Sequence, residues 1–289
     1  MPSTHPVTHV SDTALWVAMY RAMESERPDA LFRDPLARKL AGTRGEEILR
    51  NIPKGKQFAW PMIVRTAVID EIILRLVREE GADAVLNLAA GLDARPYRLP
   101  LPRSLTWVEA DFPDMLDYKE AHLDGEQPRC TVERERVDLT DPAARRALFQ
   151  RLGASAGRVL VITEGLLVYL TAEQVSGLAQ DLQAQPSFQW WLMDLGSPQL
   201  LKFLEKTWGG TLSAGNAPMR FAPAEGTGFF QPYGWEEAEY RSMFDESIRL
   251  DRTFPMARFW RWVFRFYPKK KQAEMRRFSG IPLLRRRNG

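Results

Sequence analysis

Polar residues that could bind a ligand come directly after short apolar segments of this chain. Residues 84–89 form one such segment, and Gly91 and Asp93 follow it. A glycine lets a ligand approach the backbone closely, because no Cβ stands in the way. A pyrophosphate-binding loop carries three glycines, whereas here Ala89 and Ala90 precede Gly91. The segment therefore favours a nucleoside ligand that lacks a pyrophosphate.

Acidic residues follow three further apolar segments. Glu109 and Asp111 end the second, where a carboxylate could accept hydrogen bonds from both ribose hydroxyls or be a solvated acid. Asp138 and Leu139 follow the third, where the acid could accept from the amine of an adenine or cap the next helix. Glu164 ends the fourth. Because an unpaired buried carboxylate is costly, Glu164 requires either a cationic ligand group or a structural salt bridge.

The elements that would position these residues alternate between strand and helix. Strands are expected at 84–89, 105–110, 130–137, 158–163 and 188–194. Helices are expected at 113–123, 142–152 and 172–183, the last with a capping box from Thr171 and Gln174. This alternation predicts a mostly parallel, doubly wound α/β sheet with right-handed crossovers. The carboxyl ends of its strands share one edge, so the polar residues should gather there.

Helical periodicity dominates the chain before the first strand. It extends over residues 12–42, interrupted at Pro28 and at Asp34-Pro35. A second helix is expected over 62–80, closed by a glycine. These helices predict an N-terminal cap, residues 1–80, packed on the core.

The chain beyond the fifth strand is less regular. Glycines and prolines predict an insertion over residues 200–235. Aromatic residues alternate with Arg and Val over 260–266, which predicts a strand that pairs with 246–251. This hairpin would complete a seven-stranded sheet in a core of residues 81–268. Residues 269–289 carry a net charge of +7 and are expected as a solvated basic tail.

Taken together, these segments resemble the leucine carboxyl methyltransferase-like family of S-adenosylmethionine-dependent O-methyltransferases. The patterns Gly-Leu-Asp-x-Arg from Gly91 and Glu-Gly-x-Leu-x-Tyr-Leu from Glu164 are specific when they occur together. The resemblance implies a class I methyltransferase-type sheet and covers about residues 12–265. It is carried by residues 13–14, 20–22, 34–37, 65–66, 69–70, 87–95, 97–99, 109–113, 164–170 and 233–235.

The resemblance implies S-adenosylmethionine as cofactor, S-adenosylhomocysteine as product and no metal. Arg65, helped by Arg21, would pair with the cofactor carboxylate, and Glu164 would face its amino-acid end. Tyr169 would face the acceptor, and Tyr169 and Glu164 are the implied catalytic residues. The implied cofactor-binding residues are Arg21, Arg65, Ala89, Gly91, Asp93, Glu109, Asp111, Asp138, Leu139 and Glu164.

Two features bear on how these residues would work. Relatives carry Gly-Ala-Gly where this chain has Ala89-Ala90-Gly91, and the extra methyl groups could crowd the cofactor. The chain has three histidines, His5, His9 and His122, although a hydroxyl acceptor usually needs a histidine base. A carboxylate is ionised at neutral pH and needs none, so the sequence favours a carboxyl acceptor, or a phenol deprotonated by an acid or a tyrosine.

Apolar side chains near the cap and the insertion suit a small hydrophobic or aromatic acceptor, as in secondary metabolism, although such residues also build plain cores. The candidates are Trp16, Met19, Tyr20, Met23, Trp60, Trp208, Phe229 and Phe230, with Trp16, Tyr20, Tyr169, Trp208 and Phe229 as the main substrate-binding residues. A protein C-terminal carboxylate is the rival acceptor. A non-catalytic cofactor-binding protein and a nicotinamide oxidoreductase are the rival functions, and the missing glycines argue against the latter.

Composition limits the partners and the location. The chain has 289 residues, a net charge of +3 and one cysteine, Cys130, which excludes an intrachain disulfide and a cysteine-based zinc site. No segment has the length of apolar residues that a membrane span needs, and no signal peptide is readable. We therefore expect a cytoplasmic enzyme with a small-molecule acceptor and no membrane partner. Outside the basic tail the charge is −4, which disfavours nucleic-acid binding.

Overall fold

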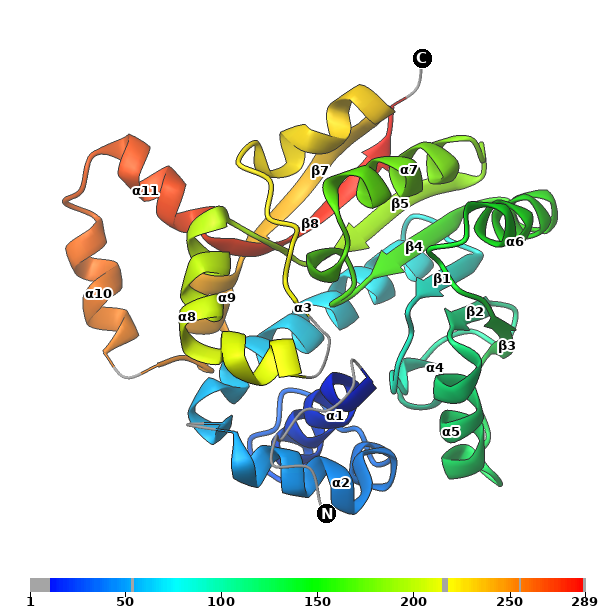
Figure 1. The fold of residues 1–289 in the computed structure, drawn as a ribbon, viewed down its shortest axis with the longest axis horizontal. Helices are drawn as coiled ribbons and strands as arrows, with labels where there is room; N and C mark the ends of the chain where they lie inside the picture. The colour runs from blue at the N-terminus through cyan, green and yellow to red at the C-terminus, as the bar shows by residue number, and fades with distance from the viewer. Residues whose placement is uncertain (1–10, 53–54, 215–217, 255, 288–289) are drawn as a thin grey trace.

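The chain folds around a mixed sheet, shown in Figure 1. The computed structural model describes residues 11–52, 55–214, 218–254 and 256–287, without the side chains of residues 11, 56 and 208–214. The sheet order is β3-β2-β1-β4-β5-β8-β6, and β7 pairs with the other side of β8. The five strands of the parallel part are β1 (Ala84–Leu88), β2 (Thr106–Asp111), β3 (Thr131–Arg136), β4 (Val159–Thr163) and β5 (Phe188–Met193).

The parallel strands confirm the doubly wound prediction. β1 and β4 are buried along their whole length, as expected of apolar strands covered on both faces. β3 alternates between exposed and partly buried residues and forms one edge of the sheet, as its alternating sequence indicated. The strand order reverses between β1 and β4, which places the expected ligand crevice beside the carboxyl ends of these two strands.

The antiparallel end of the sheet corrects the predicted hairpin. It consists of β6 (Leu195–Gly196), β7 (Trp235–Ser242) and β8 (Ser279–Arg286). Residues 246–251 and 260–266 lie instead in and beside α9 (Met243–Arg249) and α10 (Ala257–Phe264), so both strand predictions were wrong. The alternation over 260–266 misled because aromatic and basic residues there also recur at helical spacing, and so short a window does not separate the two periods.

Part of the expected basic tail belongs to the sheet. After α11 (Lys269–Arg276), strand β8 lies between β5 and β7 and runs antiparallel to both. Ile281, Leu283 and Leu284 are buried, whereas Arg285 is exposed. Because basic residues dominate this segment, its short apolar run was not recognised as a strand of the sheet.

Helices cover both faces of the sheet. On one face, buried side chains of the strands pack against α6 (Pro142–Ser155), α7 (Ala172–Gln183) and the 3₁₀ helix η3 (Gly226–Tyr233). On the other they pack against α3 (Ala59–Arg78). The capping box predicted for α7 is present. The remaining helices are α4 (Arg95–Arg98), α5 (Pro113–Leu123), α8 (Pro198–Ala214), η1 (Gly55–Phe58) and η2 (Leu167–Tyr169).

The N-terminal helices form a separate cluster with the segment that follows β1. α1 (Ser11–Ser25) and α2 (Ala37–Asn51) lie side by side and pack on α3, Leu92 and Ala94. The predicted insertion after β5 contains α8 and η3. Within the described residues, no helix is both long and apolar enough to cross a bilayer.

Candidate functional site

A cavity of about 620 Å³ opens at the carboxyl ends of β1, β4 and β5. Its polar lining comes from the segments that follow these strands and from Arg65 on α3. Residues of α1 add one helix face, namely Thr13, Ala14, Trp16, Val17, Tyr20 and Arg21. Segments that are distant in the sequence therefore meet at the edge where a doubly wound sheet binds its ligand.

The loop after β1 holds an unusual backbone conformation. Ala89 has φ +53° and Gly91 has φ +49°, a region that residues with a Cβ rarely adopt. A Cβ added at Gly91 would lie 3.4 Å from the Cβ of Ala14, so α1 lies directly over this loop. The loop is held to β2 because the Gly91 N–H donates to Asp111 Oδ2 at 2.7 Å. Asp111 is therefore the residue that joins the two strand ends.

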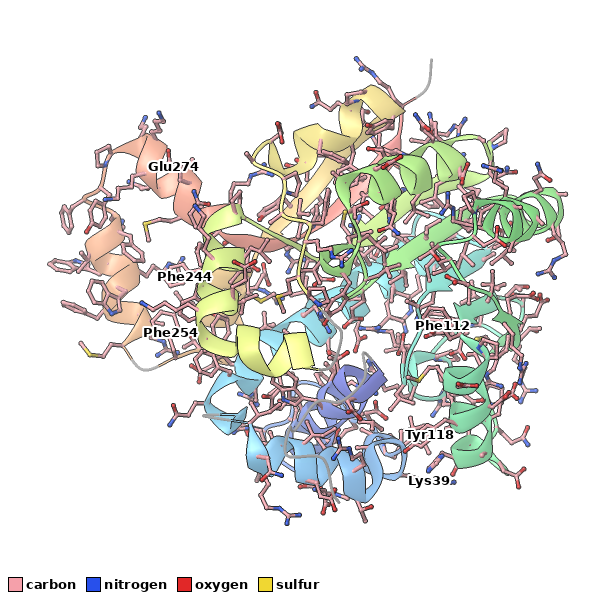
Figure 2. All side chains as sticks on the ribbon, in the orientation of Figure 1. Lys39, Phe112, Tyr118, Phe244, Phe254 and Glu274 are labelled. Atoms are coloured by element: carbon pink, nitrogen blue, oxygen red, sulfur yellow. The ribbon has the colours of Figure 1, made fainter. Side chains whose placement is uncertain are left out.

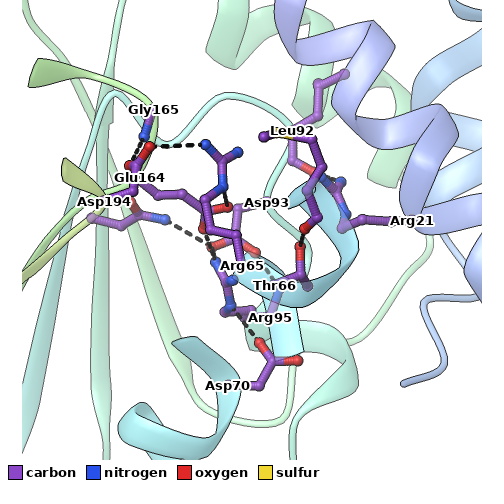
Figure 3. Close-up of polar contacts among 12 residues, drawn as sticks. Arg21, Arg65, Thr66, Asp70, Leu92, Asp93, Arg95, Glu164, Gly165 and Asp194 are labelled. Carbon is purple, nitrogen blue, oxygen red and sulfur yellow. Dashed lines mark hydrogen bonds and ion pairs between the residues drawn. The ribbon is translucent and has the colours of Figure 1, made fainter. Parts of the chain in front are cut away.

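Three charged residues of the cavity lining lie close together, and Figure 3 shows their contacts. Arg65 Nε lies 2.9 Å from Glu164 Oε1, an ion-pair distance without hydrogen-bond alignment. Arg65 Nη1 donates to Asp194 Oδ2 at 3.2 Å. Asp194 also accepts a hydrogen bond of 2.6 Å from the Gly165 N–H, which follows β4. A guanidinium and two carboxylates thus share one buried corner.

A second guanidinium supports this corner from behind. Arg95 Nη1 donates to Asp93 at 2.9 Å and to Glu164 at 2.7 Å, and its Nε donates to Asp70 at 2.6 Å. Asp93 also accepts from the Asn87 side chain at 2.9 Å. Because each carboxylate has two or more charged or amide partners, the network fixes the positions of Asp93 and Glu164.

Burial and neighbouring charges set the protonation of these acids. Burial opposes ionisation of Asp93, but Arg95, Lys119 and other cations outweigh it and lower its pKa to about 2. Burial likewise opposes ionisation of Glu164, and Arg95 and Arg65 prevail and lower its pKa. Asp111 differs, since burial raises its pKa against the hydrogen bonds from Gly91 and Phe112. Asp93 and Glu164 are therefore anionic at neutral pH.

Two residues expected to touch the cofactor are engaged with the protein itself. Arg21 donates to Asp34 at 2.9 Å and to the Leu92 carbonyl at 2.6 Å, so it braces the loop after β1 while lining the cavity. Glu109 is fully buried and pairs with Lys119 Nζ at 2.8 Å and Arg134 Nε at 3.0 Å. Glu109 is not among the residues of the cavity lining, so its contact with a ribose stays a prediction from the family resemblance.

The segment after β3 does not reach the cavity lining. Asp138 is exposed and accepts from the N–H and hydroxyl of Thr140 at 2.8 and 2.6 Å. Asp141, three residues later, is the N-cap of α6, so the alternative of Asp138 as the cap of that helix is wrong. Leu139 is partly buried against the sheet core, and its carbonyl accepts from Arg145.

The expected acceptor residues divide into two groups. Tyr169, Trp16 and Tyr20 line the cavity, together with Trp60. Tyr169 is hydrogen-bonded to Thr13, and burial raises the pKa of its phenol. Tyr20 donates to the Gly55 carbonyl at 2.6 Å.

The other expected acceptor residues lie elsewhere. Phe229 packs against Phe221 and Phe230 in an aromatic core cluster, outside the cavity lining. Met19 and Met23 belong to the cluster of N-terminal helices. The side chain of Trp208 lies outside the described residues.

Sequence reasoning missed three residues, one in the charged corner and two in the network that supports it. Asp194 follows β5 as Glu164 follows β4, so the same rule applied to the fifth strand would have identified it. Arg95 ends the Gly-Leu-Asp-x-Arg pattern, which does not by itself indicate that this arginine pairs with Asp93 and Glu164. Asn87 is a buried polar residue within β1, whose neighbours in the strand are apolar.

The rest of the cavity wall is apolar and comes from the C-terminal half of the chain. Phe221 precedes η3, and Phe244 and Phe254 lie in and after α9. Figure 2 shows Phe244 and Phe254 near α8 and α9. Side chains of α8, α10, α11 and the segment before β8 complete this wall: Leu200, Leu201, Phe203, Leu204, Phe264, Met275 and Phe278.

Comparisons of the sequence with known proteins agree with one another. Residues 14–183 match the family model described as leucine carboxyl methyltransferase. A protein of Mycobacteroides abscessus, provisionally named an S-adenosyl-L-methionine-dependent methyltransferase, is 39% identical over 179 residues, which is 57% of this chain and 56% of that relative. A Parafrankia protein of the same provisional name is 37% identical over 60% of this chain and 58% of its own. The chain thus matches little more than half the length of these relatives.

Comparisons of the structure identify the same fold in two solved structures. A DUF574 family protein of Streptomyces avermitilis superposes with a TM-score of 0.58, at 15% identity, over 93% of this chain and 96% of the other. A Thermobifida fusca protein provisionally described as a methyltransferase superposes with a TM-score of 0.54, at 16% identity, over 98% and 96%. At this identity the superpositions establish the fold alone.

Proposed function

The chain belongs to the leucine carboxyl methyltransferase family, and we propose that it is an S-adenosylmethionine-dependent O-methyltransferase. We further propose that its acceptor is the carboxylate, or else the phenolic hydroxyl, of a small hydrophobic or aromatic molecule. The observation that carries the proposal is the cavity itself, which joins a charged corner at the strand ends to an apolar wall. A cytoplasmic location remains a prediction from the cysteine content.

The charged corner fits the amino-acid end of the cofactor. That end carries a carboxylate and an ammonium, so it needs a cation and an anion side by side. Arg65 offers a buried Nε for which the described residues provide no aligned acceptor. Glu164 and Asp194 stand next to it as anions. Arg65 would hold the carboxylate, and the two acids would hold the ammonium and face the positive sulfur.

The loop after β1 and the end of β2 fit the nucleoside end. Gly91 lines the cavity and has no Cβ, so a ligand can approach its backbone from the cavity side. Asp111 lies outside the cavity lining but is held beside the loop by hydrogen bonds from Gly91 and Phe112, and its oxygens keep acceptor capacity for ribose hydroxyls. Asp138 and Leu139 lie outside the cavity lining, so only the family resemblance assigns them to the adenine.

The chemistry needs alignment more than acid–base help. When bound, the cofactor supplies an already activated methyl group, which moves to an acceptor oxygen as the bond to sulfur breaks. The protein then has to hold the acceptor oxygen in line with the methyl group and exclude water. The apolar wall performs the second task. Tyr169 keeps its proton at neutral pH, so its hydroxyl can donate a hydrogen bond to the acceptor but cannot remove a proton.

The described cavity lining favours a carboxylate over a hydroxyl acceptor. It contains no histidine, and His122 lies on α5, stacked on Tyr118. His5 and His9 lie outside the described residues. Glu164 is held anionic by two guanidiniums and is a poor base. A carboxylate arrives already ionised and needs no base.

Calorimetry tests the proposed cofactor. We expect S-adenosylmethionine and S-adenosylhomocysteine to bind and NAD not to bind. Arg65→Ala should weaken binding of both by about 1–3 kcal/mol, as when one partner of a charged hydrogen bond is lost. Arg75→Ala is the matched control, since Arg75 lies on the same helix but pairs with Glu80 and Glu239 outside the cavity. Binding of NAD alone would end the proposal.

Turnover separates catalysis from mere cofactor binding. S-adenosylhomocysteine release is measured with paired acceptors that differ only in bearing an aromatic carboxylate or a phenol. The carboxylate should react at a rate that is flat from pH 6 upward, because its ionisation is complete there. If S-adenosylhomocysteine were released with the phenol alone, the acceptor would be a phenolic hydroxyl and not a carboxylate. Release with neither, despite cofactor binding, would favour a non-catalytic protein or a peptide acceptor.

A further inference from the structure

An exposed aromatic and basic segment extends from the body of the protein. Residues 256–278, here called the arm, comprise α10, α11 and their connection. Figure 1 shows both helices at one end of the molecule, outside the sheet and the helices that cover it. In Figure 2 several side chains of α10 point outward from that end. The proposed methyl transfer gives these outward side chains no role.

Large aromatic side chains form a stripe along the arm. Phe259, Trp262 and Phe266 follow one another at intervals of three and four residues, which places them on one side of the helical segment. Their exposed fractions are 49%, 56% and 73%. The ring of Trp262 lies 6.2 Å from that of Phe259 and 5.1 Å from that of Phe266, centroid to centroid. Apolar groups this large are rarely left in water without a partner.

Basic residues flank the aromatic stripe. The arm carries eight Lys and Arg residues and one acid, Glu274. Arg258, Arg261 and Arg265 share a neighbouring face of the segment, again at intervals of three and four. Three of the eight pair with acids of the body: Arg258 with Asp251, Arg276 with Asp245 and Arg277 with Glu237. Arg261, Arg265, Lys269 and Lys270 are exposed and form no ion pair within the described residues.

We propose that the arm docks this protein onto a membrane surface rich in anionic phospholipid. A helix that carries aromatic side chains on one face and arginines beside them lies in the interface of a bilayer, with its rings at the level of the headgroups. The basic residues face the negative lipid headgroups, so the charge of the arm complements that of the surface. Such a helix rests on the membrane and does not span it, so the absence of a spanning helix among the described residues is compatible with docking.

The inner side of the arm favours lipid over a nucleic acid, which would also meet aromatic and basic groups. Phe264 and Met275 of the arm line the apolar wall of the cavity, and Phe278 ends the arm at the same wall. A polyanion gains nothing from an apolar cavity beside its binding surface, whereas a lipid-soluble molecule can pass from one to the other. If the proposed function holds, the acceptor would enter the cavity from the membrane surface.

Vesicle flotation with the full chain tests the docking surface. Vesicles of equal parts phosphatidylglycerol and phosphatidylcholine should bind the protein at least about tenfold more tightly than pure phosphatidylcholine, and added salt should weaken the binding. Phe259→Ser/Phe266→Ser should lower binding to the anionic vesicles by about tenfold or more. Phe259→Trp/Phe266→Trp is the matched control and should retain it, since tryptophan suits the interface.

A pair of charge-reversal variants tests whether the basic residues of the arm contribute to binding. Lys269→Glu/Lys270→Glu changes two exposed residues of the arm, and Arg78→Glu/Arg103→Glu changes two exposed residues elsewhere by the same net charge. The first pair should reduce binding to anionic vesicles at least about fivefold, whereas the second should change it less than twofold. Equal effects of both pairs would show that only total charge matters and would overturn the arm as the docking surface.

Two further outcomes would also overturn the proposal. One is equal binding to both vesicle types that none of the arm variants changes. The other is an arm-dependent affinity for a single-stranded oligonucleotide with no binding to vesicles, which would make the arm a nucleic-acid surface. These measurements use neither cofactor nor acceptor. Failure of docking therefore leaves the cofactor titrations untouched, and failure of methyl transfer leaves the vesicle result standing.

Discussion

Ala89 occupies a backbone conformation that suits glycine. At φ +53° its Cβ crowds the neighbouring carbonyl, a strain of about 1–2 kcal/mol that a glycine would not have. The strain persists because the neighbours of Ala89 fix the loop: its own N–H donates to the Ala110 carbonyl at 2.8 Å, and Asp111 holds Gly91. Strain of this kind concentrates at ligand-binding loops.

Ala89→Gly should therefore stabilise the protein. The relieved strain exceeds the added entropy of the unfolded chain, and we expect a gain of about 0.5–1 kcal/mol in the free energy of unfolding. Ala90→Gly is the matched control, because Ala90 is not among the residues with positive φ and should lose about the same amount. Urea denaturation measures both. A loss in both variants would mean that the loop is not strained at Ala89.

Asp93 should make the protein sensitive to acid. Its pKa in the folded state is about 2, below the value of 3.8 for an ordinary aspartate, so the unfolded chain binds more protons between these values. The contribution of Asp93 to the free energy of unfolding is therefore fully present above pH 5 and decreases as the pH is lowered. The contribution of Asp93 should shrink by about 1 kcal/mol between pH 5 and pH 3.

The test compares the pH dependence of two proteins. Asp93→Asn removes this titration, so its urea midpoint should fall less steeply between pH 5 and pH 3 than that of the unchanged protein. The slope is compared, and not the absolute stability, because the substitution also weakens the hold on Arg95. Parallel pH profiles would show that Asp93 titrates normally.

For single residues, the sequence predicts which acids lie at the end of a strand, but it does not predict which side chains pair with them. Glu164, Asp93 and Asp111 could be predicted because acids after buried strands meet at one edge of the sheet. The ion pairs of Glu109 could not be predicted. They depend on Lys119 and Arg134, which lie on α5 and β3 and reach the carboxylate only in the folded chain. Whether a carboxylate faces a ligand or a lysine is decided by packing.

Strand β8 shows the corresponding limit for an element. The five parallel strands were recognisable as apolar runs, because both of their faces are buried. β8 lies between β5 and β7, yet its sequence is a short apolar stretch beside Arg285 and Arg286. Charge composition therefore indicated a tail. What makes the segment a strand is its pairing with β5, which lies more than eighty residues earlier in the chain.

Two adjacent substitutions test the role of β8. Leu284 is fully buried in the sheet core, so Leu284→Ala should cost about 2–5 kcal/mol of unfolding free energy. Arg285→Ala should change it by less than about 1 kcal/mol, since the Arg285 side chain is 62% exposed and pairs with Glu236 at the surface. Chemical denaturation compares them. If both substitutions were neutral, this segment would be the solvated tail that its charge suggested.

The whole molecule is needed to close the cavity. Its walls include residues from Thr13 on α1 to Ser279 at the start of β8, so neither the sheet nor the N-terminal helices contain the site alone. The sequence could predict that the strand ends meet, because that is a property of the parallel sheet. The sequence could not predict which helices cover the strand ends, because that depends on how α1 and the arm pack in the folded chain. Ligand binding should therefore change the conformational mobility of the segments that cover the cavity.

Hydrogen exchange should reveal this coupling. A ligand in the cavity touches α1, the loop after β1 and the segment after β5, so saturating S-adenosylhomocysteine should slow amide exchange in peptides covering residues 13–21, 89–93 and 194–204. Peptides of α6 should be unchanged, because no residue of α6 lines the cavity. If protection were confined to residues 89–93, α1 would not roof the bound ligand. Protection that extended equally to α6 would indicate general stiffening of the fold and would remove the argument that these distant segments close around one ligand.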